Sequence, residues 1–149
     1  MDDIDRQLVT TLVQDARTSF AELARQVGLS PPSVHERVRR LESDGVLRGY
    51  HAEVNPKAVG LGVSALVGVL QREGVESADL ADRLAAVEEV EDCWFVAGDE
   101  AFVVRVRVAD VDALEQTLGA LRRIPGVSRT RTTVVLSTRV ESRRRVPEA

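Results

Sequence analysis

The sequence has little of the chemistry that catalytic and metal sites need. Its 149 residues include one cysteine and two histidines. A single cysteine excludes a disulfide within the chain, and one cysteine with two scattered histidines is too few for a metal-ligand cluster. The sequence also contains no nucleophile beside a base and no glycine loop of the kind that holds phosphates. These absences argue against an enzyme and against a metal or other cofactor.

Long apolar runs are absent as well. No stretch has the features of a signal peptide or a membrane span, which predicts a cytoplasmic protein without a membrane partner. Lysine is almost missing, because Lys57 stands against 19 arginines. Arginine suits forked contacts to phosphate and guanine, although such a bias equally reflects genome composition. Cys93, in an apolar run, is expected to be a small core residue.

The most informative segment is residues 19–49, which predicts two short helices joined at a glycine. Ser19 as N-cap and Glu22 three residues later form a capping box, in which each side chain satisfies a backbone N–H of the other residue. This helix is expected to end at Gly28. The second helix begins with Ser30 as N-cap, followed by Pro31, and ends at residues 44–45. The layout is that of a helix-turn-helix DNA reader.

The apolar spacing predicts that these helices share one core. Residues three, four or seven positions apart form a single buried stripe: Leu23, Ala24, Val27, Leu29, Val34, Val38 and Leu41. An upstream helix with an acidic first turn, Asp2, Asp3 and Asp5, carries a further apolar set, Ile4, Leu8, Leu12 and Val13. The prediction is a three-helix domain ending near residue 45.

The opposite face of the second helix is the predicted DNA surface. We expect DNA contacts from Ser30, Pro32, Ser33, His35, Glu36, Arg37, Arg39 and Arg40, with Arg17 and Arg48 on phosphates at the flanks. Two alternatives stay open: Glu36 and Arg40 lie four residues apart and can pair with each other, and His35 can be a half-buried packing residue.

Charge adds a constraint to this prediction. The chain has a formal net charge of −4, and residues 1–55 hold seven arginines against nine acidic residues. A binder that relies on overall positive charge is therefore not expected from a single copy, and the positive charge must be concentrated on one face. Two small domains in 149 residues also have modest cores, so association would help stability.

The second half of the chain predicts a different kind of domain. Apolar strand patterns and amphipathic helices follow one another in the order β-α-β-β-α-β. The predicted strands are Val63–Leu70, Cys93–Ala97, Phe102–Val108 and Val127 to about Val140. The predicted helices are Ser77–Val87 and a second one that starts at Asp110 or Asp112, ends at about Pro125 and has Val111 on its apolar side. This order is the ferredoxin-like pattern, an antiparallel sheet with both helices on one face. Because the first strand is apolar on both sides, we expect a second subunit to cover the other face and form a homodimer.

The fold class is therefore α+β, a three-helix, winged helix-turn-helix domain followed by a βαββαβ ferredoxin-like domain. The predicted boundaries are 1–45 for the DNA-binding domain, 46–59 for a β hinge, 60–140 for dimerisation and sensing, and 141–149 for a charged tail. The tail carries Arg143, Arg144 and Arg145, which either touch phosphates or form a frayed end.

The sequence resembles the Lrp/AsnC, or feast/famine, transcriptional regulators over nearly its whole length. The resemblance rests on Asp5-Arg6, Glu22-Leu23-Ala24, Gly28-Leu29-Ser30, residues 37–42, residues 45–50, Gly98-Asp99, Pro125-Gly126-Val127 and Thr130-Arg131-Thr132. It implies a transcriptional regulator that binds double-stranded DNA. Such a regulator forms dimers and commonly an octamer, and it binds an amino acid between dimers.

Carried onto this chain, the resemblance places the effector pocket at Gly98, Asp99, Glu100, Ala101, Thr130 and Thr132. The family usually has an aromatic residue and then an aspartate after the Gly-Asp pair, where this chain has Glu100 and Ala101. The ammonium partner must then be Asp99 or Glu100, or the response is altered or absent; a plain hairpin turn is the competing interpretation. An architectural protein that bends DNA without a ligand is accordingly the alternative function.

Overall fold

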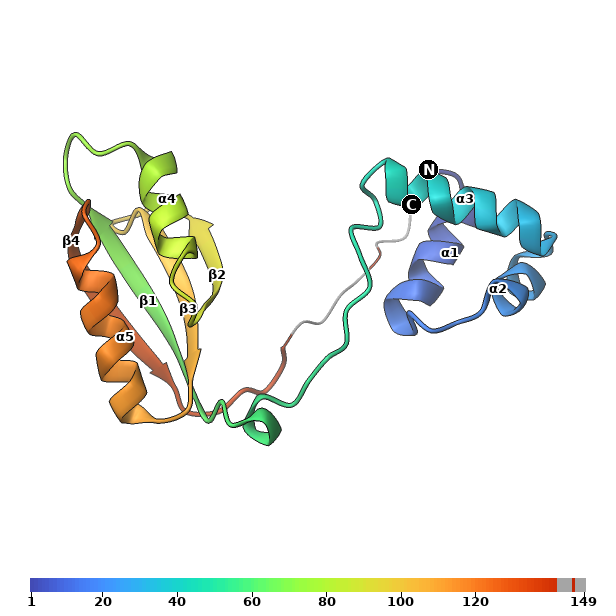
Figure 1. Cartoon of the computed structure of the whole chain (residues 1–149). Coiled ribbons are helices and arrows are strands. Elements are labelled where there is room, and N and C mark those ends of the chain that lie inside the picture. Colours follow the sequence, from blue (N-terminus) through green and yellow to red (C-terminus); the bar gives the residue numbers. More distant parts are fainter. Residues whose placement is uncertain (142–145, 147–149) are drawn as a thin grey trace. The chain divides into compact units, whose positions relative to one another are not determined.

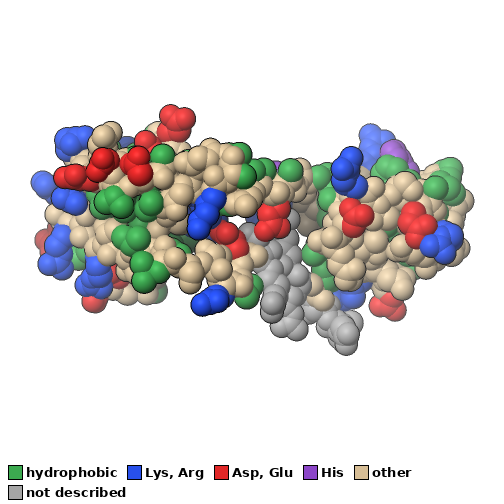
Figure 2. Space-filling model, turned by 90° about the horizontal axis from the view of Figure 1, so that it is seen from below, with side chains coloured by type: hydrophobic (Ala, Val, Ile, Leu, Met, Phe, Trp, Pro, Cys, Tyr) green, Lys and Arg blue, Asp and Glu red, His purple; other side chains and the backbone are tan. Residues whose placement is uncertain are grey.

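The computed structural model describes residues 1–141 and 146, and its chain forms two compact units (Figure 1). The first unit is built on Met1–Glu53 and the second is Val54–Arg139. Their boundary falls inside the segment 46–59 that was expected to link two domains. None of the helices among the described residues is both long and apolar enough to cross a membrane. Acidic and basic side chains are interspersed over the visible face of each unit (Figure 2).

The first unit is the predicted bundle of three helices. These are α1 (Asp3–Gln14), α2 (Phe20–Val27) and α3 (Pro31–Ser43). Their shared core consists of the buried side chains Leu8, Leu12, Leu23, Ala24, Val34 and Val38, with Ile4, Val27, Leu29 and Leu47 packed partly buried against it. Six of the seven residues of the predicted stripe therefore lie in one core, and the seventh, Leu41, is buried but is not part of this cluster.

The helix ends follow the predicted signals with one exception. Ser19 Oγ accepts a hydrogen bond from the backbone N–H of Glu22 at 3.2 Å, and α2 ends at Gly28 with φ 69°. The reciprocal half of the capping box is wrong, because the Glu22 carboxylate instead accepts hydrogen bonds from Arg25 and Gln26. The hydrogen bonds from Arg25 and then Gln26 lower the pKa of Glu22 to about 2.

The predicted β hinge does not form a strand in the single chain. Residues 46–55 contain no helix or strand, and a short 3₁₀ helix follows at Pro56–Val59. An extended segment counts as a strand only when a neighbouring strand accepts and donates its backbone hydrogen bonds, and the described part of this chain offers no such neighbour here. The role of residues 46–59 as a hinge stays a prediction.

The second unit has the predicted βαββαβ order. Its elements are β1 (Val63–Gln71), α4 (Ser77–Ala85), β2 (Val90–Phe95), β3 (Phe102–Val108), α5 (Val111–Arg123) and β4 (Val127–Val135). The sheet order is β2-β3-β1-β4, with every neighbouring pair antiparallel. Both helices cover the same face of the sheet (Figure 1). The core between them is built mainly from Ala65, Val67, Val69, Leu80, Leu84, Val104, Val106 and Leu121.

The other face of the sheet, called here the open face, carries the alternate residues of each strand. Leu66 of β1 lies on it with 38% of its surface exposed, and Trp94 of β2 is 45% exposed. Charged pairs border this apolar area: Arg105 contacts Asp92 and Glu91, and Arg107 contacts Glu91. An apolar area of this kind on a sheet normally packs against another layer.

Three details of the second unit differ from the sequence-based prediction. Strand β2 begins at Val90, three residues before the predicted Cys93, and its second and third residues, Glu91 and Asp92, contact Arg105 of β3. Strand β4 ends at Val135 and not near Val140. Val111 is 68% exposed and lies outside the core, although Asp110 does cap its helix. Cys93 packs partly buried against the core, and burial raises the pKa of its thiol.

Candidate nucleic-acid interface

The local sequence fixes α3 at both ends and along its inner side. Ser30 Oγ accepts a hydrogen bond from the backbone N–H of Ser33 at 3.3 Å, and Pro31 occupies the first helical position. Val34, Val38 and Leu41 bury the inner side of the helix. With its ends capped and its inner side packed, α3 presents one rigid outer face.

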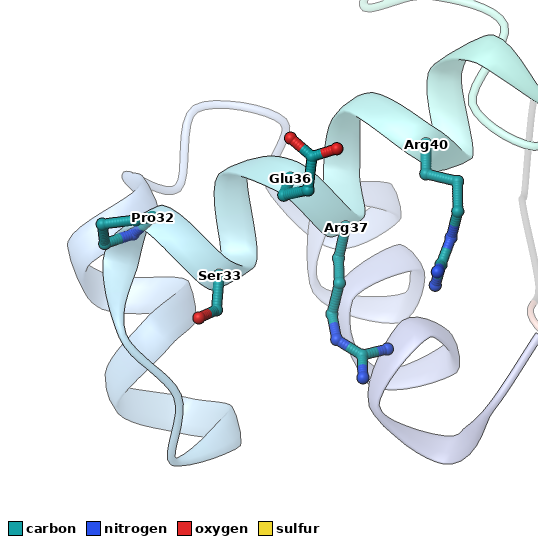
Figure 3. A pocket seen from close by; sticks show the side chains of 5 residues that line it. All are labelled: Pro32, Ser33, Glu36, Arg37 and Arg40. Atoms are coloured by element: carbon teal, nitrogen blue, oxygen red, sulfur yellow. The ribbon is translucent and has the colours of Figure 1, made fainter.

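The outer face of α3 is hollowed where the predicted DNA-binding side chains gather. Pro32, Ser33, Glu36, Arg37 and Arg40 line a shallow depression of about 480 Å³ (Figure 3). In this view Glu36 points away from the direction taken by Arg37 and Arg40. The sequence prediction therefore brought together residues that do share one surface, although their side chains point in different directions.

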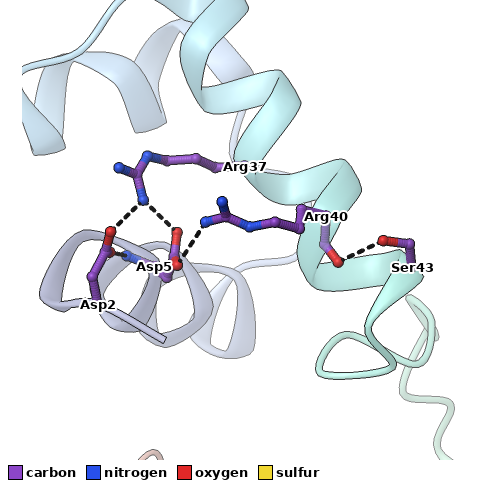
Figure 4. Close-up of polar contacts among 5 residues, drawn as sticks. All are labelled: Asp2, Asp5, Arg37, Arg40 and Ser43. Atoms are coloured by element: carbon purple, nitrogen blue, oxygen red, sulfur yellow. Dashed lines mark hydrogen bonds and ion pairs between the residues drawn. The ribbon is translucent and has the colours of Figure 1, made fainter.

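Both arginines of this surface are held by α1. Arg37 Nη1 lies 2.6 Å from Asp2 Oδ2 and 2.8 Å from Asp5 Oδ1, and Arg40 Nη2 lies 3.0 Å from Asp5 Oδ2 (Figure 4). A hydrogen bond from the backbone N–H of Asp5, followed by the contact with Arg37, lowers the pKa of Asp2. The same two carboxylates raise the pKa of Arg37. We call these four residues the carboxylate–arginine cluster.

This cluster decides one of the open alternatives. Arg40 pairs with Asp5 and not with Glu36, so the suggested pair within the helix is wrong. Asp2 and Asp5 were predicted only as acidic residues of a helix start. A signal was present, because Asp5 lies one residue after Ile4 and three before Leu8, on the side of α1 that faces the core. A buried acid requires a cationic partner.

The remaining predicted DNA contacts are exposed. His35 is exposed, and its ring contacts that of Phe20 edge to face with 5.0 Å between the ring centroids. The alternative of a half-buried packing residue is therefore wrong. Arg39 is exposed and forms no ion pair with the described residues. Arg17 and Arg48 are exposed on either side of the helix pair.

The serines at the start of α3 are already hydrogen-bonded. The hydroxyls of Ser30 and Ser33 lie 2.8 Å apart, and Ser30 also accepts the N-cap bond. A hydroxyl holds one proton and two lone pairs, so both serines keep some capacity for a further partner. The first turn of α3 therefore offers hydroxyls at the positive end of the helix dipole. It offers no free backbone N–H group, because Pro31 and Pro32 have none and those of Ser33 and Val34 donate to Ser30.

One contact joins α3 to the segment that follows it. Tyr50 Oη donates a hydrogen bond to Glu42 Oε1 at 2.8 Å. Burial first, and then the Glu42 contact, raises the pKa of Tyr50 to about 12. Sequence reasoning assigned no role to this pair, because a contact between a helix and an irregular segment has no periodic signature.

In the second unit, the predicted effector residues lie on two sides of the sheet. Glu100 lies over Gly68 on the open face, and its Oε1 is 2.7 Å from Arg131 Nη1. Thr130 and Thr132 pair with Val69 and Val67, whose side chains are buried on the helix-covered face, so the threonines are on that face. The single chain does not bring Glu100 together with the two threonines.

The loop before β3 is tied to the sheet by its last residue. The Ala101 N–H donates to the Val69 carbonyl at 3.0 Å, and the Ala101 carbonyl accepts from Val96 N–H at 3.0 Å. Asp99 is exposed and makes no hydrogen bond or ion pair with the described residues. Of the two candidate ammonium partners, Glu100 is therefore occupied by Arg131 and Asp99 is free.

The tail lies largely outside what can be described. Arg143, Arg144 and Arg145 are outside the described residues, so their contact with phosphates stays a prediction.

Comparison with known proteins identifies both units. The model of the AsnC-type helix-turn-helix domain matches residues 1–42, and that of the Lrp/AsnC ligand binding domain matches residues 64–145. The HTH-type transcriptional regulator LrpA of Mycobacterium tuberculosis is 46% identical over 147 residues, covering 99% of this chain and 97% of the relative.

Solved structures agree over the same length. A feast or famine regulatory protein from M. tuberculosis, complexed with L-methionine, has a TM-score of 0.92 at 46% identity and covers 98% of this chain and 99% of its own. Escherichia coli AsnC has a TM-score of 0.90 at 28% identity, with 99% of both chains covered. The α+β architecture, the helix-turn-helix unit and these relatives agree: the chain belongs to the Lrp/AsnC family and is a DNA-binding transcriptional regulator, not an enzyme.

Proposed function

We propose that the outer face of α3 enters the major groove and reads the operator. The observation that carries the proposal is the depression on α3, where arginine, serine and glutamate side chains share a rigid, exposed surface. The proposed contacts are Ser30, Pro32, Ser33, His35, Glu36, Arg37, Arg39 and Arg40. Arginine reads guanine through O6 and N7, and glutamate accepts from the amino group of cytosine.

Within this set we assign different roles. Arg37 and Arg40 contact base edges, and Arg17 and Arg48, at the flanks of the helix pair, contact phosphates. Arg39 is exposed without an ion pair among the described residues, so it reaches the duplex without giving up a partner. This division separates residues that select a sequence from residues that only position the protein.

The test begins with selection of bound fragments from a random DNA pool, which supplies an operator. Arg37→Ala and Arg40→Ala are then each expected to cost about 1–3 kcal/mol on that operator and to relax specificity. Arg48→Ala is expected to weaken binding to operator and random DNA alike. Equal losses of all three variants on both DNAs would refute the division of roles.

We propose further that the second unit senses an amino acid. The support is the match to the ligand binding domain and the L-methionine bound to a relative. The proposed pocket includes Gly98, Asp99, Glu100, Ala101, Thr130 and Thr132, with Asp99 as the partner of the ammonium group because Arg131 occupies Glu100. Since the threonines lie on the opposite side of the sheet from Glu100, the pocket needs parts of more than one subunit.

The Glu100–Arg131 ion pair also supports the alternative function, an architectural protein without a ligand. Glu100 is engaged and Ala101 has no carboxylate, so this loop offers a single free acidic group. Thermal unfolding with each of the twenty amino acids separates the two functions, because a ligand that binds only the folded state raises the melting temperature. A rise with one of them supports sensing, and no rise at millimolar concentration supports the architectural function.

We also propose that two copies pair through the open face of the sheet and that such dimers assemble further, to an octamer. The support is the apolar area around Leu66 and Trp94, which lies uncovered in the single chain. A two-fold pair presents two α3 helices to a palindromic site. Light scattering on the full chain tests this assembly, since a monomeric mass at micromolar concentration would contradict it.

A further inference from the structure

The carboxylate–arginine cluster balances the charge of the proposed DNA-reading face before DNA arrives. Two carboxylates, Asp2 and Asp5, meet two guanidinium groups, Arg37 and Arg40, at 2.6 to 3.0 Å. Together the two carboxylates and two guanidinium groups carry no net charge, so their attraction for a phosphate at longer range nearly cancels. The two arginines that best suit guanine therefore add little to the general attraction of this face for DNA.

The two carboxylates are held very differently. The Asp5 side chain is 4% exposed and contacts both arginines, so its removal would leave a hole, take away the partner of Arg40 and leave Arg37 with Asp2 alone. The Asp2 side chain is 51% exposed and contacts Arg37 alone among the arginines. Its other contact is the helix cap, in which Asp2 Oδ1 accepts from the backbone N–H of Asp5 at 2.8 Å.

Arg37 retains donors for a second partner. Both of its contacts use Nη1, and its other guanidinium nitrogens form no hydrogen bond or ion pair with the described residues. A guanidinium group has five donor hydrogens in one plane. Arg37 can therefore keep Asp5 through Nη1 while a DNA group replaces Asp2, with no change in the helix packing.

We infer that Asp2 is a built-in counter-ion of Arg37 that DNA displaces on binding, and that it thereby lowers affinity for DNA of any sequence. The inference rests on the proposed DNA-reading role of Arg37. On an operator, base contacts offset the free energy lost when Arg37 gives up Asp2, whereas random DNA provides no such contacts. Asp2 is thus a specificity-determining residue that does not itself contact a base, whereas Asp5 is a positioning residue that aims both arginines.

The test compares Asp2→Asn with Asp3→Asn in the full chain. Asparagine is as good an N-cap as aspartate, so the first variant removes the charge and keeps the cap. Asp3 is an exposed neighbour in the same turn and makes no hydrogen bond or ion pair with the described residues. Its variant therefore makes the same change in net charge without touching the cluster.

Binding is measured by fluorescence anisotropy on the selected operator and on random duplex, over a series of salt concentrations. Asp2→Asn is expected to bind random duplex about 1.5- to fivefold more tightly than the wild type at low salt, the range of one exposed ion pair. Its plot of log affinity against log salt should steepen by up to about 0.9, the slope of one added phosphate contact. Asp3→Asn is expected to change both quantities much less.

Two results would overturn the inference. Equal effects of Asp2→Asn and Asp3→Asn would mean that only net charge matters, and weaker binding by Asp2→Asn with a lower melting temperature would mean that the contact only supports α3. Arg37→Ala separates this failure from failure of the proposed reading face. If Arg37→Ala binds DNA like the wild type, the reading face is wrong; if it binds weakly while Asp2→Asn gains nothing, only the counter-ion is wrong.

Discussion

At the scale of single residues, Gly68 and Glu100 occupy one space on the open face of the sheet. A Cβ atom at position 68 would lie 2.7 Å from Glu100 Cγ, closer than unbonded carbon atoms approach. The absence of a side chain at Gly68 lets Glu100 cross the strand and reach Arg131. A glycine inside a strand is otherwise unfavourable by roughly 0.5–1 kcal/mol relative to alanine.

A double-mutant cycle tests this dependence. Gly68→Ala alone is expected to lower the free energy of unfolding, because Glu100 must leave its rotamer and its ion pair. In the Glu100→Ala background, Gly68→Ala is expected to raise the free energy of unfolding by about 0.5–1 kcal/mol. Without the Glu100 side chain nothing is displaced, and alanine is more favourable than glycine inside a strand. Chemical denaturation gives the four values, and a coupling energy near zero would contradict the contact.

The residue scale also marks where prediction from sequence stops. Ser19, Gly28 and Ser30 were predicted as helix ends because a cap depends on residues within one turn of each other. The pairing of Asp5 with Arg37 was not predicted, since 32 residues separate them and only the packing of α1 on α3 brings them together. Local signals define helices, whereas partners across the core require the tertiary structure.

At the scale of elements, the Tyr50–Glu42 hydrogen bond fastens α3 to the start of the segment 46–59. Tyr50 is the single tyrosine of the chain, so its ionisation can be followed directly by ultraviolet absorbance. Its folded pKa is raised to about 12, above the value near 10 of an unfolded chain. The stability from the neutral phenol is therefore present below pH 10 and is lost as the pH rises toward 12.

We predict that native protein forms tyrosinate near pH 12 and denatured protein near pH 10. Glu42→Gln should lower the native pKa only part of the way, because burial is the larger cause and remains in the variant. Glu36→Gln, on the same helix but without contact to Tyr50, is the control and should leave the titration unchanged. A wild-type midpoint equal to that of the denatured chain would show that the phenol is free in solution.

The sheet shows a second limit at this scale. The strands β1 and β3 were predicted well because their buried alternate residues are apolar. The start of β2 was missed because Glu91 and Asp92 are polar residues that pair with arginines on the neighbouring strand. An edge strand with charged pairs lacks the apolar alternation from which strands are predicted.

At the scale of the whole molecule, net charge and assembly have to be considered together. A chain of net charge −4 gains no general attraction to DNA, and the cluster removes two arginines from what attraction α3 has. Affinity must then come from specific contacts made by more than one α3 at once. Linking two binding modules raises the affinity for a double site without any new contact.

The same scale explains why the effector site was the least predictable part. Its proposed residues lie on both faces of one sheet, with Glu100 over Gly68 and Thr130 on the helix-covered side. A pocket made from several copies leaves no complete pattern in one chain. The resemblance supplied these residues, and the fold of a single copy does not test them.

The last prediction joins the open face to DNA binding. Leu66→Asp places a charge in the middle of the proposed subunit contact, where a buried unpaired carboxylate is strongly unfavourable. The variant is expected to have the mass of a monomer in light scattering and an unchanged circular dichroism spectrum. Val111→Asp is the control, because Val111 is an exposed valine of α5 on the helix side, and it should not yield monomers.

Binding to DNA then shows whether the pair of subunits reads the operator. Wild-type protein is expected to bind two half-sites one helical turn apart about 10²-fold more tightly than one half-site, because the second contact is intramolecular. Leu66→Asp should bind both DNAs with the same, half-site affinity, since each α3 then acts alone. If Leu66→Asp keeps the preference for the double site, the subunits are joined through another surface, and the open face must be assigned a different role.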